Sequence, residues 1–223
     1  MMINETLAKY SDWAFESAFA VLVLAFVLLV IQYASTRARV VQEREDASKL
    51  VNAGGVTDAD EPGRVEEQQG RTLADRFGNM GYAVLVVGTV LLIASSVLRG
   101  FATSRFPLGN MYEFVTMACA AALVGGLVLM AKPAFRSLWV FMLAPILVLI
   151  FLAGTVLYAD AAPVVPALNS FWLPIHVTVV SVGAGIFLIS GVASLLFLLR
   201  LRYPKDEEGG SIIGKLAHRL PDA

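Results

Sequence analysis

Charged residues are scarce in this sequence: Asp, Glu, Lys and Arg make up 16% of its 223 residues, against 57% for hydrophobic ones. Soluble domains carry about a quarter charged residues, so the composition predicts a membrane protein. The formal net charge is −1, and no basic stripe is available to neutralise phosphates, which argues against a nucleic-acid partner. The single cysteine, Cys119, lies in an apolar run, where it cannot form an internal disulfide and has no metal-binding spacing around it.

Long apolar runs are what the sequence has instead. The residues before the first run form no basic cluster, whereas Arg37 and Arg39 follow it, so we expect a retained helix rather than a signal peptide. The predicted fold class is all-α: a polytopic membrane protein with about five transmembrane helices, the length of each run matching the ~30 Å of hydrocarbon that a helix must cross. The runs lie at 14–34, 80–98, 112–131, 138–158 and 172–199.

Basic residues are distributed unevenly among the segments that connect these runs. They cluster in 37–76, 132–136 and 200–205, whereas 159–171 has none. Basic residues favour the cytoplasmic side of a membrane. We therefore expect a multi-pass protein of the plasma membrane with its N-terminus outside and its C-terminus in the cytoplasm.

This topology divides the chain into four parts. They are the first transmembrane helix (1–36), a polar cytoplasmic loop (37–78), a four-helix membrane region (79–200) and a cytoplasmic tail (201–223). The loop is expected to be largely disordered, because its stretch 43–71 is charged and poor in aromatic residues. The membrane region carries two motifs at its outer face, at 104–114 and 169–176.

Ionisable residues are absent from the interiors of the predicted spans. No Asp, Glu, Lys, Arg or His occurs in 114–131, 138–158 or 177–199, and the interiors of the first two spans are equally free of them. Ion-coupled transporters place such groups near the bilayer midplane, where their cost implies a use. The sequence therefore argues against a channel or carrier and predicts that any chemistry lies at the outer interface.

The first outer-face motif is SRFPLGNMYEF, at 104–114. Asn110 followed three residues later by Glu113 predicts a helix cap: the Asn110 side chain accepts from backbone N–H groups, and Glu113 reaches back to the Asn110 N–H. The helix dipole also favours a carboxylate in the first turn, and Tyr112 suits the interfacial aromatic belt. Capping alone explains why Asn110 and Glu113 occur in this motif. The alternative is that the two residues take part in a binding site.

The second outer-face motif opens the last span. Asn169 or Ser170 can cap the helix, and Trp172 is placed to anchor it at the interface. His176 follows about one turn into the helix, at a depth similar to that of Glu113. Two interpretations of His176 stay open: its ring hydrogen-bonds a neighbouring carbonyl or a lipid headgroup, or its neutral imidazole is an axial ligand for haem iron.

Two stretches resemble the CcsA family (ResC, or CcsB in some naming) of system II cytochrome c biogenesis: FPLGNMYEF, before one span, and SFWLPIHVTVVSVGAGIF, which opens another. The tail IIGKLAHRL is also similar to that family. The resemblance implies a haem-handling membrane protein. With a ResB-type partner, the family is held to move haem b across the membrane and present it, reduced, to apocytochrome c. The complete complex acts as a cytochrome c haem lyase. His176 falls where the family has the first of two outward-facing haem ligands.

The resemblance also suggests roles for the residues around His176. Trp172, Glu113, Tyr112 and Asn110 are candidates to orient the ring or to line the haem surface. Arg105 is a candidate partner for a haem propionate, since a guanidinium matches carboxylate geometry.

The chain also departs from the family pattern. The family continues with a tryptophan-rich outer loop, the WWD domain, and with further histidines, whereas Trp13, Trp139 and Trp172 form no such run. We therefore expect an N-terminal portion that, by itself, is a poor catalyst of haem attachment. A different class of function stays open, a helical scaffold that binds no haem, because small residues at Ser181–Gly185 and Ser190–Ser194 let helices approach closely.

Overall fold

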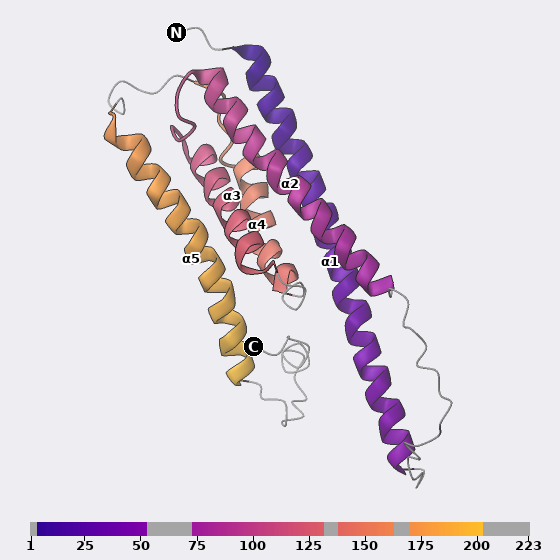
Figure 1. Cartoon of the computed structure of the whole chain (residues 1–223). Helices are drawn as coiled ribbons and strands as arrows, with labels where there is room; N and C mark the ends of the chain where they lie inside the picture. The colour runs from indigo at the N-terminus through magenta and orange to yellow at the C-terminus, as the bar shows by residue number, and fades with distance from the viewer. Residues whose placement is uncertain (1–3, 53–72, 132–137, 163–169, 203–223) are drawn as a thin grey trace.

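The computed structural model describes residues 4–52, 73–131, 138–162 and 170–202 (Figure 1). Every regular element among them is an α-helix, and all five helices are long and apolar enough to span a membrane. This confirms the predicted all-α, multi-pass fold, while the orientation of the termini stays a prediction. The helices are α1 (Glu5–Asn52), α2 (Leu73–Thr103), α3 (Met111–Leu129), α4 (Leu138–Thr155) and α5 (Trp172–Arg202).

The first helix is longer than expected. The polar loop was predicted to begin at residue 37, but α1 continues to Asn52 and α2 already begins at Leu73. Residues 37–52 contain three Arg, two Glu, two Ala and three Val but no glycine or proline, so most of them favour a helix or tolerate one even in a polar environment. The rest of the predicted loop, 53–72, and the predicted tail beyond residue 202 lie outside the described residues.

α1 and α2 form a pair on one side of the bundle, α3 and α4 pack against this pair, and α5 packs on the far side of α3 (Figure 1). α1 and α2 lie side by side over much of their length, and α3 packs against α2, α4 and α5. The start of α1, the loop between α2 and α3, and the start of α5 lie together at one end of the bundle, uppermost in Figure 1 and called the upper end below. Both motifs predicted at the outer face lie at this end.

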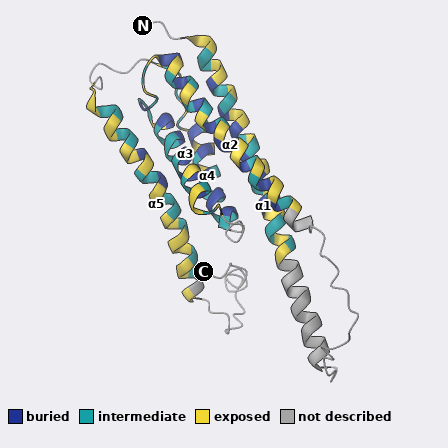
Figure 2. Ribbon diagram, in the orientation of Figure 1, coloured by how far each residue is buried: buried dark blue, intermediate teal, exposed yellow. Residues whose placement is uncertain are grey.

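The core follows from the helical spacing of apolar residues. On α1, one buried residue recurs every three or four positions, which is the period of a helix face that meets its neighbours. The outward faces are also apolar but exposed, most extensively on α5 (Figure 2). An apolar exterior of this kind suits contact with lipid. The buried α1 series is Phe15, Ala18, Leu22, Ala25 and Leu29.

The contact between α3 and α5 depends on one glycine. A Cβ added to Gly185 would lie 2.7 Å from the backbone oxygen of Ala118 and 2.8 Å from the backbone nitrogen of Ala122. The two backbones therefore approach more closely than a side chain allows. This confirms the close approach expected at Ser181–Gly185, whereas Ser190 and Ser194 are exposed.

Candidate functional site

Asn110 caps α3, as predicted. Its side-chain oxygen accepts a hydrogen bond from the backbone N–H of Glu113 at 2.8 Å, and its own backbone is extended. The return bond differs from the predicted one: Glu113 Oε2 accepts from the backbone N–H of Gly109, at 2.6 Å, in place of the Asn110 N–H. The carboxylate reaches one residue further back because its position is set by more than the cap.

Two arginines share the carboxylate of Glu113. Arg105, in the loop after α2, donates from Nη1 to Oε2 at 2.9 Å and from Nη2 to Oε1 at 3.1 Å. Arg99, on α2, donates from Nε to Oε1 at 3.0 Å. Only 1% of the Glu113 side chain is exposed, so this carboxylate is buried with four donors around it, the Gly109 N–H included. A carboxylate that deep in the protein requires such partners.

Arg99 joins four elements at the upper end. Besides Glu113 on α3, its Nη1 donates to Asp12 Oδ1 on α1 at 3.2 Å, and its Nη2 donates to the carbonyl oxygen of Ala159, after α4. Its guanidinium carbon lies 4.7 Å from the centre of the Tyr112 ring, which adds a cation–π contact. With 2% of its side chain exposed, Arg99 depends entirely on these partners.

Tyr158, just after α4, is the last member of the group of side chains around Arg99. Its hydroxyl donates to Asp12 Oδ2 at 3.0 Å, and its ring packs edge-on against Tyr112, with the ring centres 5.5 Å apart. Partial burial raises the pKa of Tyr158 above its usual range, and the hydrogen bond and negative charge of Asp12 raise it further. The hydroxyl therefore stays a donor at neutral pH. We call Asp12, Arg99, Arg105, Glu113 and Tyr158 the Arg99 cluster.

Sequence reasoning missed Asp12 and Arg99. Both lie just outside the predicted spans 14–34 and 80–98, so the span boundaries alone do not place them inside the bundle. The apolar stretch that follows Arg99 was the available signal, since it allows α2 to continue for another turn and brings Arg99 inside. A charged residue inside a membrane helix needs a partner, and Glu113 and Asp12 are carboxylates at the same end of neighbouring helices.

His176 lies on α5 and forms no hydrogen bond with the Arg99 cluster within the described residues. Its side chain is exposed, and no hydrogen bond or ion pair within the described part of the chain joins it to Asn110, Tyr112, Glu113 or Arg105. Ser170 begins the helix, because its hydroxyl accepts from the Trp172 N–H at 3.3 Å; Asn169, the other predicted cap, lies outside the described residues. Trp172, one turn before His176, is 68% exposed.

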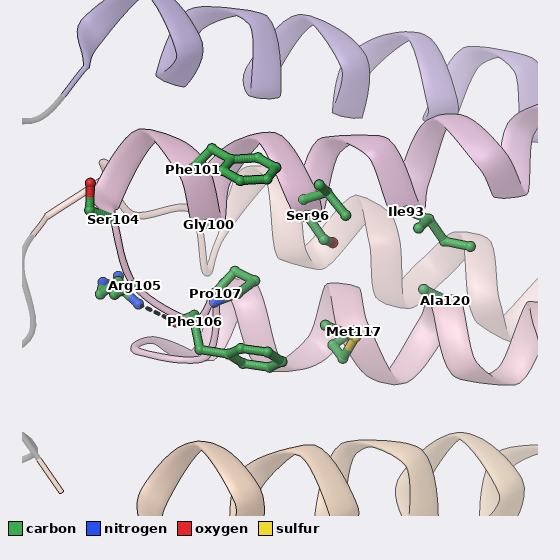
Figure 3. Close-up of a pocket in the computed structure, with 11 residues that line it drawn as sticks. Ile93, Ser96, Gly100, Phe101, Ser104, Arg105, Phe106, Pro107, Met117 and Ala120 are labelled. Carbon is green, nitrogen blue, oxygen red and sulfur yellow. Dashed lines mark hydrogen bonds between the residues drawn. The ribbon is translucent and has the colours of Figure 1, made fainter. Parts of the chain in front are cut away.

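An apolar groove of about 490 Å³ lies between α2 and α3, beneath the loop that joins them (Figure 3). Ser104, with φ at 49°, turns the chain at the end of α2, and Gly100 lets the loop fold back, since a Cβ there would lie 3.2 Å from Pro107 Cδ. Among the described residues that line the groove, Arg105 is the only charged one, and it connects the groove to the Arg99 cluster. The apolar walls are mainly Ile93, Val97, Phe101, Phe106, Met117 and Ala120.

The chain is similar to curated proteins named cytochrome c biogenesis protein CcsA. The one from Picosynechococcus sp. is 31% identical over 149 residues, which cover 65% of this chain and 43% of that protein. The chain is therefore similar to the CcsA family over about two thirds of its own length. A CcsA from Synechococcus sp. is 32% identical over 62% of this chain and 40% of its own length, and one from the alga Porphyra purpurea is 29% identical over 58% and 41%.

The match covers less than half of each of these CcsA proteins. No family model matches the chain, and no solved structure matches it. What the geometry of the upper end does in the process named for these CcsA relatives is a separate question.

Proposed function

We propose that this chain takes part in cytochrome c biogenesis and holds haem at the upper end of the bundle through His176. The process is the one named for its CcsA relatives. The observation that carries the site is the exposure of His176 one turn into a membrane-spanning helix, at the end of the bundle where α1 also begins. Haem b is the cargo in this proposal, so the protein binds and orients it without altering it.

The residues around His176 fit a haem. Its ring donates to no group within the described residues and accepts from none, so either nitrogen is open for the iron. Trp172 lies four residues earlier on the same face of α5, since residues four apart on a helix are neighbours. Trp172 is 68% exposed and offers an apolar ring for the porphyrin on that face.

In this proposal, the other predicted site residues support the haem-binding surface from the loop between α2 and α3 and from the start of α3. Asn110 and Glu113 fix the start of α3, and Tyr112 packs beneath the Arg99 guanidinium. Arg105 is the arginine that a haem propionate could reach, because 13% of its side chain is exposed against 2% for Arg99. Iron coordination would come from His176 alone among these residues.

The partners in this proposal follow from the family. A ResB-type protein would act with the chain, and apocytochrome c would receive the haem at the outer face. The lipid bilayer would surround the exposed helix faces shown in Figure 2, which carry many large apolar residues. The alternative function, a scaffold without haem, was suggested by small residues on α5, but Gly185 is already used by packing of α5 on α3 within this chain.

The test is a His176→Ala variant of the full chain, purified in mild detergent and reconstituted with haem. We expect loss of the haem absorption band, and its partial return when imidazole is added, because free imidazole can occupy the vacated coordination position. Ser190→Ala, at an exposed position further along α5, is the control and should bind haem like the parent. Full haem binding by His176→Ala with an unchanged spectrum would refute the assignment.

A further inference from the structure

Two segments of the upper end are held by the same pair of arginines. One is the outer loop, Arg105–Asn110, between α2 and α3; the other is the connector, Tyr158–Ala162, which follows α4. Neither segment is helical, so neither has a hydrogen-bond ladder of its own to fix its conformation. Their geometry depends on what they bond to.

The outer loop is fixed through Glu113. Arg105 forms two hydrogen bonds to this carboxylate and donates a third from Nη1 to the carbonyl oxygen of Phe106 at 3.1 Å. The Gly109 N–H bonds to the same carboxylate. Both ends of the loop are thereby joined to a single buried side chain on α3.

The connector is fixed through three contacts to the Arg99 cluster. Arg99 donates to the carbonyl oxygen of Ala159, and Arg105 donates from Nε to the carbonyl oxygen of Ala162 at 3.1 Å. The third contact is the hydrogen bond from the Tyr158 hydroxyl to Asp12. Each arginine therefore holds Glu113 with one part of its guanidinium and the connector with another.

We propose that Arg99 is a positioning residue that sets the outer loop and the connector in one fixed arrangement. The planar guanidinium makes this possible, because its donors point in different directions at fixed angles. One donor meets α3, one meets α1 and one meets the connector. The functional consequence rests on the proposed function: the surface so arranged is the one beside which His176 would hold haem.

Lysine cannot replace Arg99 in this role. Its ammonium keeps the positive charge that Glu113 and Asp12 need, but it is a compact point charge without the fork. Arg99→Lys should therefore preserve the fold and release the Ala159 carbonyl. A role for Arg99 in charge balance alone predicts instead that lysine restores every property of the parent.

The experiment measures the distance between the two segments directly. Spin labels are placed at Phe106→Cys and Asp160→Cys, both exposed positions, in the full chain carrying Cys119→Ala, and read by pulsed electron paramagnetic resonance. We expect a narrow distance distribution in this parent and a broadened one in Arg99→Lys. Arg76→Lys, the same exchange at an exposed position of α2, is the matched control and should leave the distribution narrow.

A second variant tests how the connector is held without changing an arginine. Tyr158→Phe removes only the hydroxyl that bonds Asp12, at a residue 43% exposed, and should broaden the distribution less than Arg99→Lys does. Unchanged distributions in both variants would overturn the positioning role.

Haem spectra of the same variants separate this inference from the proposed function. If both hold, Arg99→Lys retains haem with a shifted absorption band, and His176→Ala loses the band. Broadening in Arg99→Lys together with full haem binding by His176→Ala would keep the positioning role and reject the haem site.

Discussion

Arg99 on α2 and Glu113 on α3 form an ion pair, 3.0 Å from Nε to Oε1, in which 2% and 1% of the two side chains are exposed. Arg99 follows the apolar part of α2, and Glu113 is the one charged residue of α3. The pair is neutral as a unit, and with Asp12 and Arg105 it forms a set of two positive and two negative charges. Burying charges is costly, so such a set is stable only while it is complete.

Glu113→Ala should therefore destabilise the protein far more than loss of a helix cap. It leaves the buried Arg99 and the partly buried Arg105 without their shared carboxylate, for which a cost of about 3–5 kcal/mol is typical. Asn110→Ala removes only the cap and should cost about 1 kcal/mol. The two variants are compared by denaturant unfolding of the purified protein in detergent. Equal losses would show that Glu113 contributes through capping alone, as the sequence first suggested.

The raised pKa of Tyr158 predicts a dependence on alkaline pH. A tyrosine whose folded-state pKa lies above its unfolded value contributes stability that is present below the unfolded pKa, and this stability decreases as pH rises toward the folded pKa. Above roughly pH 10, the usual tyrosine value, the contact with Asp12 should therefore begin to lose its contribution. Thermal unfolding of the parent across this range should show a decline that Tyr158→Phe lacks. A decline of equal size in both proteins would assign it to other groups.

The two glycines of α5, Gly183 and Gly185, provide a matched test of the α3–α5 contact. A Cβ at Gly183 would meet nothing within 4 Å, whereas at Gly185 it would press on the α3 backbone. Gly183→Ala should stabilise the helix slightly, by about 0.5–1 kcal/mol, because alanine favours helices. Gly185→Ala should be destabilising despite the same gain. Thermal unfolding in detergent measures both, and a stabilised Gly185→Ala would contradict the close packing.

The sequence predicts the helices well because membrane spans depend on local composition. Five apolar runs became five helices, and the Asn110 cap was predictable since its partners lie within three residues. The Arg99 cluster was not, because its members lie on α1, α2, α3 and the connector, and only packing brings them together. The prolonged α1 was missed for another reason: a polar stretch was equated with disorder although its residues tolerate a helix.

The membrane orientation is the remaining expectation on which His176 depends. If the N-terminus lies outside, the upper end faces the exterior, as the scarcity of basic residues in 159–171 predicts. Single cysteines at Asp160 and at Thr36, near opposite ends of the bundle, are introduced into the Cys119→Ala chain. In intact cells, a membrane-impermeant maleimide should label the cysteine at position 160 and should label that at 36 only after lysis. The reverse pattern would place His176 at the cytoplasmic face, where it could not present haem to an apocytochrome outside.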